Sequence, residues 1–281
     1  MSIPIIQKLV EAWQSGDPDR VAALFAPDAR WVIDGQALEG RAEIAMAGAA
    51  SMANAKAVRI VLRRAFSDKR EASWHVVEWA FRMKPADPSQ VDTSTGDSRE
   101  CEQGVLIHEQ DGQIVYMRTH NDKFRMCSIA WDAPLRPESR PTTLPTPQQE
   151  MTVDDVIVLQ NRHVMHGWRL GNADTVTSSH MPHSVILNAW TTVDGHDNIR
   201  ASVRKYTENF KDTHIDIHRV VYDGQNVAVN QTWSCTNCVT GVRAGDEDLI
   251  IGVIQDGKIW YWREYFDPEQ STQTLEQVLF N

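Results

Sequence analysis

The sequence has little of the material that several common kinds of protein require. Its 281 residues include only four cysteines, too few for a disulfide scaffold, and the single C-x-x-C pair (Cys235, Cys238) has no second Cys or His cluster at metal spacing. Lys and Arg number 28 against 38 Asp and Glu, a net charge of −10. Because nucleic-acid binding depends on clustered positive charge, we expect no nucleic-acid partner. Because the cysteine pair has no further ligands at metal spacing, we also expect no metal site.

Long apolar runs and export signals are missing as well. No stretch approaches the roughly 20 apolar residues of a membrane helix. The N-terminal segment MSIPIIQKLVEAW has no basic region ahead of a long apolar one. The sequence also lacks a glycine-rich phosphate loop, a G-x-S-x-G elbow and an H-E-x-x-H motif. We therefore expect a cytoplasmic protein that makes no membrane contact and needs no cofactor.

What the sequence does contain is an internal repeat. WQSGDPDRVAALFAPDARWVIDGQALEGRAEI (13–44) matches WRLGNADTVTSSHMPHSVILNAWTTVDGHDNI (168–199) without a gap, at a shift of 155. EQGVLIHEQDGQIVYMRTHND (102–122) matches EDLIIGVIQDGKIWYWREYFD (247–267) at a shift of 145, with eight identities. Self-similarity of this kind indicates a tandem duplication. We predict one domain over 1–125, a proline-rich linker over 126–150 and a second domain over 151–281.

Each copy shows the same order of elements. Helical spacing of apolar residues, followed by Gly and Pro stop signals, predicts helices over 5–15, 19–25, 41–52, 153–170, 174–180 and 197–210. Alternating patterns predict strands over 30–33, 58–66, 72–83, 101–109, 113–121, 184–190, 215–221, 227–235, 248–255 and 258–266. Helices followed by antiparallel strands predict an α+β fold in which a sheet curls around the helices and encloses a conical pocket.

This order, together with LIIGVIQDGKIWYWREYFDPEQ near the C-terminus, resembles the SnoaL-like domains of the nuclear transport factor two-like superfamily. The resemblance implies two tandem cystatin-like domains, each a curved-sheet cone. Single-copy relatives commonly pair through their sheets, so it also implies that the two copies pack as an intrachain pseudo-dimer. A homodimer of such chains stays open.

The W-R-[DE]-Y-F-D run is similar to that of limonene epoxide hydrolases, which implies a catalytic role for the carboxylate Glu264 and for a strand asparagine, Asn188. The family's acid/base pair, an Arg and an Asp two residues apart, falls on Gln231 and Trp233 in this chain. The pair is therefore missing here. Glu264 shares a strand face with Trp262 and Phe266, and poor solvation between these rings predicts a raised carboxyl pKa. An outward Glu264 paired with a surface cation is the alternative.

The first copy offers a different titratable group. Thr119 stands where the second copy has Glu264, but His75 shares a strand face with Val77 and Trp79 and is the candidate catalytic residue there. A register slip of one residue would turn Glu78 inward instead. The predicted substrate contacts are strand residues that would form pocket walls: Trp31, Trp79, Trp190, Gln231, Trp233 and Trp262.

These observations lead to one main functional hypothesis and two alternatives. Aromatic walls favour an aromatic or otherwise apolar small metabolite. We predict a cofactor-independent lyase or isomerase, with Glu264 moving a proton, Asn188 orienting the substrate and His75 as a second candidate. The second copy is expected to carry most of the turnover, since its polar set is more complete. An epoxide hydrolase-like enzyme and a ligand-binding module without turnover are the alternatives.

Overall fold

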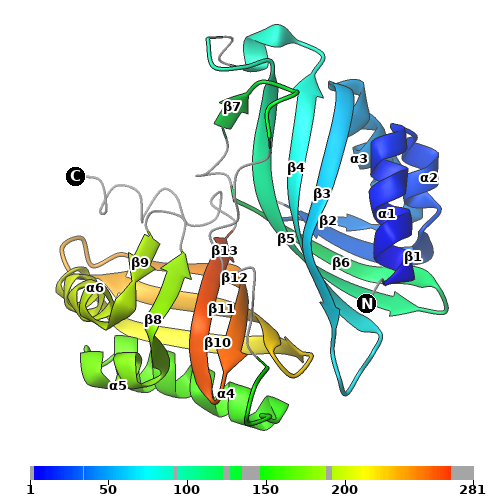
Figure 1. Cartoon of the computed structure of the whole chain (residues 1–281). Helices are drawn as coiled ribbons and strands as arrows, with labels where there is room; N and C mark the ends of the chain where they lie inside the picture. The colour runs from blue at the N-terminus through cyan, green and yellow to red at the C-terminus, as the bar shows by residue number, and fades with distance from the viewer. Residues whose placement is uncertain are drawn as a thin grey trace. The chain divides into compact units, whose positions relative to one another are not determined.

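The computed structural model of the chain describes residues 3–33, 35–91, 94–122, 127–134, 146–187 and 192–266. The chain divides into two compact units, Met1–Pro137 and Glu138–Asn281 (Figure 1). Each unit is an α+β arrangement with its own mixed sheet and its own apolar core, which confirms the predicted fold class and the duplication. No helix in the described ranges is both long and apolar enough to cross a membrane.

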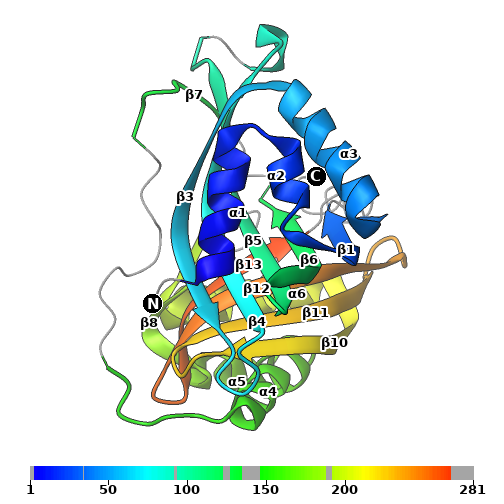
Figure 2. The ribbon, with the colours of Figure 1, turned by 90° about the vertical axis from the view of Figure 1, so that its right-hand side faces the viewer.

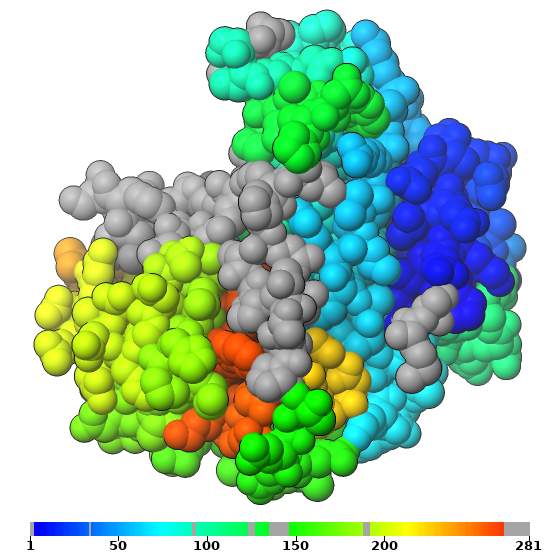
Figure 3. Space-filling view, in the orientation of Figure 1, coloured from blue at the N-terminus to red at the C-terminus, as the bar shows by residue number. Residues whose placement is uncertain are grey.

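The elements of the first unit follow the predicted order with longer strands. They are α1 (Pro4–Ser15), α2 (Pro18–Ala22), β1 (Phe25–Ile33), β2 (Gln36–Glu39), α3 (Gly40–Ala53), β3 (Ala55–Ser67), β4 (Trp74–Pro85), η1 (Pro88–Gln90), β5 (Ser98–Gln110), β6 (Gln113–Asn121) and β7 (Cys127–Ile129). Figure 2 shows α1, α2 and α3 on one face of this sheet. In the space-filling view, α1 in dark blue borders the strand β3 in cyan (Figure 3).

The second unit repeats this series. It contains α4 (Val153–Asn161), η3 (Arg162–Trp168), α5 (Ala173–Ser178), β8 (His180–Leu187), β9 (Thr192–Asp194), α6 (Gly195–Asn209), β10 (Phe210–Tyr222), β11 (Asn226–Asn237), β12 (Arg243–Gln255) and β13 (Lys258–Phe266). The predicted helix over 153–170 is thus an α-helix followed by a π-helical segment. A π segment widens the helix locally, which hydropathy spacing alone does not reveal.

The two sheets have the same strand order. The first runs β2-β1-β6-β5-β4-β3 and the second runs β9-β8-β13-β12-β11-β10. In both, the first long strand pairs in parallel with the last (β1 with β6, β8 with β13), and the other neighbours on these paths pair antiparallel. Equivalent strands therefore occupy equivalent places in each unit.

Some of the repeated identities are explained by backbone geometry. Gly40 and Gly195 precede the third helix of each unit with φ of +80° and +71°. A Cβ at either position would lie 3.3 Å from the carbonyl oxygen of Pro27 or 3.4 Å from that of Pro182. A side chain would therefore be both strained and crowded. These matches between the copies reflect the fold and not a shared chemistry.

Asp-Gly turns connect the last two long strands of each unit. Asp111 and Gly112 have φ of 51° and 78°, and Asp256 and Gly257 have φ of 49° and 74°. Two residues with positive φ are typical of a type I′ hairpin turn, whose twist matches that of the flanking strands. Such turns fix the register of β5 with β6 and of β12 with β13.

The structure places the beginning of the proline-rich stretch in the first unit. Cys127–Ile129 forms β7 and pairs with β5. The buried Arg82 on β4 then holds the segment that follows. Its guanidinium donates to the carbonyl oxygens of Ala130 (3.2 Å), Trp131 (2.8 Å), Ala133 (2.7 Å) and Pro134 (3.2 Å), and its Nε lies 2.9 Å from a carboxylate oxygen of the buried Glu100. Contacts to backbone carbonyl oxygens do not depend on which side chains the segment carries, so the amino-acid composition of the proline-rich stretch does not predict them.

Candidate functional site

A hydrogen-bonded series of polar side chains lies on the inner face of the second unit, above its apolar core. Gln160 at the end of α4 donates from Nε2 to Oε1 of Gln231 on β11 at 2.8 Å. Gln231 in turn donates from Nε2 to Oδ2 of Asp248 on β12 at 3.3 Å. All three are at most 4% exposed. The Gln231 amide thus binds one oxygen of the buried Asp248 carboxyl group, and the Gln160 amide binds Gln231.

Glu264 is the second carboxyl group of this site. It lies opposite Ile250 in the β12–β13 ladder, two residues from Asp248 on the same face. Diagonal neighbours of this kind lie within reach of long side chains. Trp262, next on that face of β13, donates its indole Nε1–H to Glu264 Oε1 at 3.2 Å. Glu264 is only partly covered, whereas Asp248 is buried. The predicted inward orientation of Glu264 is confirmed.

Both carboxyl groups hold their protons more tightly than a free side chain. Burial raises the pKa of Glu264 to about 7, against the opposing effect of the Trp262 hydrogen bond. The pKa of Asp248 is raised well above its usual range, first by burial and then by the nearby charges of Glu264 and Asp246. Since like charges in a buried site cannot ionise together without cost, the pair titrates as a unit. Burial favours the protonated form of Asp248, and Glu264, with its pKa of about 7, changes charge near neutral pH.

Two atoms of this series have no hydrogen-bond partner. They are Asp248 Oδ1 and Gln160 Oε1, both buried. A buried polar atom without a partner costs roughly 1–3 kcal/mol, so such atoms in a native fold call for an explanation. A protonated Asp248 could donate from Oδ1 to an oxygen of a bound molecule. Gln160 could accept from a hydroxyl group of the same molecule or from water.

Aromatic rings flank the carboxyl groups in a continuous series. It runs from Trp262 on β13 to His163 (5.4 Å between centroids), then to Trp168 (6.2 Å), Tyr206 on α6 (5.5 Å) and Trp233 on β11 (6.1 Å). These rings lower the local polarity and so contribute to the raised carboxyl pKa values. They also offer flat apolar surface to a ligand.

His163 belongs to a second, neutral network. Burial lowers the pKa of His163 to about 3 and also lowers that of His180. The His163 Nε2 atom accepts from Trp168 Nε1 at 2.8 Å and lies 3.1 Å from His180 Nε2. His166, three residues after His163, has a spacing that could ligate a metal ion together with it, but His166 is exposed whereas His163 is buried. Within the described ranges, no three His, Cys, Asp or Glu side chains are arranged to ligate a metal ion.

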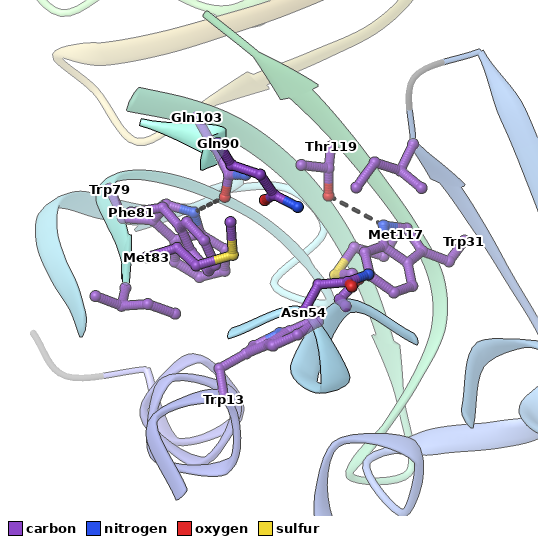
Figure 4. A pocket seen from close by; sticks show the side chains of 13 residues that line it. Trp13, Trp31, Asn54, Trp79, Phe81, Met83, Gln90, Gln103, Met117 and Thr119 are labelled. Carbon is purple, nitrogen blue, oxygen red and sulfur yellow. Dashed lines mark hydrogen bonds between the residues drawn. The ribbon is translucent and has the colours of Figure 1, made fainter. Parts of the chain in front are cut away.

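The first unit contains a cavity of about 390 Å³ that lacks such carboxyl groups (Figure 4). Its apolar walls are Trp13, Trp31, Ile33, Ile60, Trp79, Phe81, Met83 and Met117, and its polar ones are Ser51, Asn54, Gln90, Gln103 and Thr119. Among these lining residues none has an ionisable side chain. Trp31 donates from Nε1 to Thr119 Oγ1 at 3.0 Å, and Trp79 donates from Nε1 to Gln103 Oε1, as the dashed lines in Figure 4 show.

The register relates the two sites position by position. Gln103 lies opposite Trp79 as Asp248 lies opposite Gln231, and Thr119 lies opposite Val105 as Glu264 lies opposite Ile250. Gln103 and Thr119 are thus the equivalents of Asp248 and Glu264 at the shift of 145. One unit carries a carboxyl pair where the other carries a neutral amide and a hydroxyl.

The predicted site residues are distributed over both units. Gln231, Trp262, Trp233 and Glu264 lie on the inner face of the second unit, and Trp31 and Trp79 line the cavity of the first. Asn188 and Trp190 lie outside the described residues. The catalytic and binding roles of all of these stay predictions.

His75 is placed away from the cavity. It shares a strand face with Val77 and Trp79, as the predicted register requires, but lies at the β3–β4 hairpin end of β4. Its Nδ1 lies 2.8 Å from Ser67 Oγ and its Nε2 lies 3.0 Å from Glu109 Oε2. The cavity lies further along β4, at Trp79, Phe81 and Met83. The structure therefore shows His75 in a hydrogen-bonded hairpin end and not in the pocket wall.

Sequence reasoning missed Asp248 and Gln160. A signal for Asp248 was present, because it lies eight residues before Asp256 while Glu264 lies seven residues after Gly257. A two-residue turn brings positions at such similar distances close together on the two strands of a hairpin. Gln160 had no such signal, because its place depends on how α4 packs on the sheet.

The raised carboxyl pKa values predict how stability depends on pH. Glu264 binds its proton more tightly in the folded state, so its contribution is complete below about pH 4.5 and is lost as pH rises through about 7. We expect the free energy of unfolding to fall by about 2 kcal/mol over this window, after allowing for the partial exposure of the carboxyl. Urea unfolding across this pH range should show a flatter dependence in Glu264→Gln. The exposed Glu208→Gln should keep the slope of the wild type, and an unchanged slope in Glu264→Gln would contradict the burial argument.

Comparisons with known proteins agree with the repeated architecture. A family model described as the SnoaL-like domain matches residues 6–117 and 161–262, one match in each unit. No curated protein matches the chain significantly.

Several solved structures are similar to a single unit. An LEH-like epoxide hydrolase from M. tuberculosis is 20% identical over 45% of this chain and 92% of that one, with a TM-score of 0.38. A putative SnoaL-like polyketide cyclase from Jannaschia sp. CCS1 is 14% identical over 49% and 97%, with a TM-score of 0.39. A hypothetical protein with a ketosteroid isomerase-like fold from Catenulispora acidiphila, in complex with trimethylamine, is 16% identical over 43% and 86%, with a TM-score of 0.37.

Proposed function

Because this chain belongs to the SnoaL-like domain family, which includes polyketide cyclases, isomerases and epoxide hydrolases, we propose that it is an enzyme of this acid/base kind. In our proposal it is a cofactor-independent lyase or isomerase. Its substrate is a small apolar, aromatic molecule that carries an oxygen function. The observation that supports this most is the pair of neighbouring carboxyl groups Asp248 and Glu264, whose burial raises both pKa values, that of Glu264 to about 7.

The proposed reaction begins with a proton transfer to Glu264. In its ionised form this carboxylate takes a proton from a carbon of the substrate, and negative charge develops on the substrate's oxygen. Asp248, protonated and with Oδ1 unpartnered, donates a hydrogen bond or its proton to that oxygen. The proton on Glu264 then returns at a second carbon or leaves with a departing group. Asn188 keeps its proposed role as an orienting donor.

The two glutamines act as positioning residues in this scheme. Gln231 binds the other oxygen of Asp248 and Gln160 binds Gln231, so the acid is held on a relay that reaches from β12 to α4. A fixed hydrogen bond to Oδ2 leaves Oδ1 as the place for the acidic proton. The aromatic series around the pair excludes water and lies against the rings of the substrate.

A second candidate function is hydrolysis of an epoxide. The sequence lacks the Arg and Asp pair of the epoxide hydrolases at Gln231 and Trp233, but the structure supplies a carboxyl group directly opposite Gln231, at Asp248. Protonated Asp248 could donate to the epoxide oxygen while Glu264 activates a water molecule. Hydrolysis therefore needs the same two groups in the same protonation states.

A substrate screen without added cofactor tests the proposal. Aromatic enones, epoxides and diols are incubated with the chain in deuterated water, and products are followed by NMR. Deuterium at the carbon next to a carbonyl, or a shifted or eliminated double bond, supports the lyase or isomerase. A diol formed from an epoxide supports the second candidate. Tryptophan quenching with no product from any class would contradict both and favour a binding module.

The rate of the reaction should depend on pH in two limbs. We expect kcat/KM to rise as pH increases through about 7, because Glu264 must be ionised, and to fall at higher pH as Asp248 loses its proton. The two apparent pKa values belong to the pair. Asp248→Asn should remove the upper limb. A profile that is flat between pH 5 and 9, at roughly constant substrate affinity, would exclude the carboxyl pair as the acid and base.

A further inference from the structure

The cavity of the first unit differs from the carboxyl site in what it can do. Its lining residues are neutral throughout, and Gln103 and Thr119 occupy the two places that carry Asp248 and Glu264 in the second unit. A neutral amide and an alcohol do not ionise near neutral pH, so they cannot serve as a general acid and base. The cavity nevertheless has the volume and the aromatic walls of a small-molecule site.

We propose that this cavity is a second ligand site, which binds a planar, neutral aromatic molecule bearing a hydrogen-bond acceptor and does not convert it. The proposal concerns the first unit only and does not depend on the reaction assigned to the second. It combines three observations, which are the fixed aromatic walls, the hydroxyl group of Thr119 and the absence of charge among the lining residues.

The aromatic walls are held in place before a ligand arrives. Phe25 stacks on Trp31 at 6.1 Å and 25°, and the Trp31 indole N–H is bound to Thr119. Trp79 is fixed in the same way by Gln103, which also donates from Nε2 to Asn121 Oδ1 at 2.6 Å. Both indole N–H groups are thus used within the protein. What Trp31 and Trp79 offer a ligand is ring surface, and rigid ring surface favours flat molecules.

Thr119 provides the polar contact. Its oxygen accepts from Trp31, which leaves the hydroxyl hydrogen available for donation. Gln103 uses its amide oxygen and one N–H within the protein, whereas Thr119 keeps its hydroxyl hydrogen for a ligand that lies against the Trp31 ring. A carbonyl or ether oxygen on the ligand would accept from it. The ligand is therefore an aromatic ketone, lactone or similar compound in preference to a plain hydrocarbon.

Charge arguments exclude the other ligand classes. An anion would lose its hydration without gaining a cationic partner among the lining residues. A quaternary ammonium ion needs several ring faces directed at one point. Here Trp13 meets Trp31 at 70° and Phe81 at 87°, so ring edges are packed against ring faces. At these steep angles the three rings do not direct their faces at one point, so they do not form a cage.

Equilibrium binding to the full chain tests this site with three probes. They are coumarin, which is flat and bears a lactone oxygen, naphthalene, which lacks an acceptor, and tetramethylammonium. We expect coumarin to bind most tightly and to shift the indole N–H signals of Trp31 and Trp79 in ¹⁵N NMR spectra. Thr119→Val should weaken coumarin about three- to tenfold more than naphthalene, the value of one neutral hydrogen bond, since the loss of the Trp31 contact affects both probes. Tighter binding of tetramethylammonium would overturn the ligand class.

Two surface substitutions separate this cavity from the rest of the chain. Ser51 is exposed on α3 and lines the cavity, whereas its neighbour Ala50 is exposed and does not. Ser51→Trp should abolish the indole shifts and Ala50→Trp should keep them. Coumarin that still shifts Trp31 and Trp79 in Ser51→Trp would overturn the assignment. A chain with Glu264→Gln and Asp248→Asn should bind coumarin in this cavity as the wild type does, so failure of the proposed reaction and failure of this site give different results.

Discussion

Replacing Glu264 with glutamine should lower kcat by about 10²-fold or more, within the range for one acid/base group. Glutamine keeps the length of the side chain and a hydrogen bond from Trp262, but it cannot take a proton. Substrate binding should be largely retained, because the aromatic walls are unchanged. Steady-state kinetics on a substrate found in the screen, with KM determined separately, measures the effect.

The matched control for this change is Glu208→Gln. Glu208 is exposed on α6 of the same unit, so the same chemical substitution there should leave kcat within twofold of the wild type, roughly the scatter expected for a surface position. Full activity in Glu264→Gln together with an inactive His75→Ala would move the reaction to the first unit. That outcome would contradict the assignment to the carboxyl pair.

Replacing Arg82 with methionine should destabilise the first unit by about 3–5 kcal/mol, the cost of leaving a buried charge without its partner. Arg82 and Glu100 are both fully buried, and Arg82 also donates to the carbonyl oxygens of Ala130, Trp131, Ala133 and Pro134. The methionine retains the apolar part of the side chain and removes the charge. Chemical denaturation followed by far-UV circular dichroism measures the loss.

Arg59 provides the control, because it lies opposite Arg82 in the β3–β4 ladder and is exposed. Arg59→Met should change the free energy of unfolding by less than about 0.5 kcal/mol. The double variant Arg82→Met with Glu100→Leu should recover part of the loss, since no unpaired charge then remains. A loss below about 1 kcal/mol in Arg82→Met would show that the ion pair is not needed to hold this segment.

The fold could be predicted from the sequence because each element of one copy can be checked against the aligned element of the other copy. The Asp-Gly turns and the glycine stops have the same backbone conformation in both units, and they bounded most elements to within a few residues. The edge strands β2 and β9 and the linker strand β7 were missed. They are only three or four residues long and pair mainly through backbone groups, so their side-chain pattern is too short to detect.

The site was predictable only where alternation along one strand decides it. Glu264 and Trp262 follow from the pattern of β13, and so does the raised carboxyl pKa. To predict Asp248 as a site residue, one must know the register between two strands. To predict Gln160, one must know how a helix packs on the sheet. His75 shows the converse limit, because the alternation predicted its face correctly but not its position along the length of the pocket.

The Asp-Gly hairpin has a consequence for how the two halves diverged after duplication. The two side chains that decide the chemistry are diagonal neighbours on adjacent strands of each hairpin, Gln103 with Thr119 in one unit and Asp248 with Glu264 in the other. Two substitutions on one hairpin are therefore enough to exchange a neutral lining for an acidic one, with no change of backbone, strand order or length. After the duplication, one unit could thus keep a neutral binding cavity while the other acquired an acid/base pair. No intermediate along this route would need a different fold.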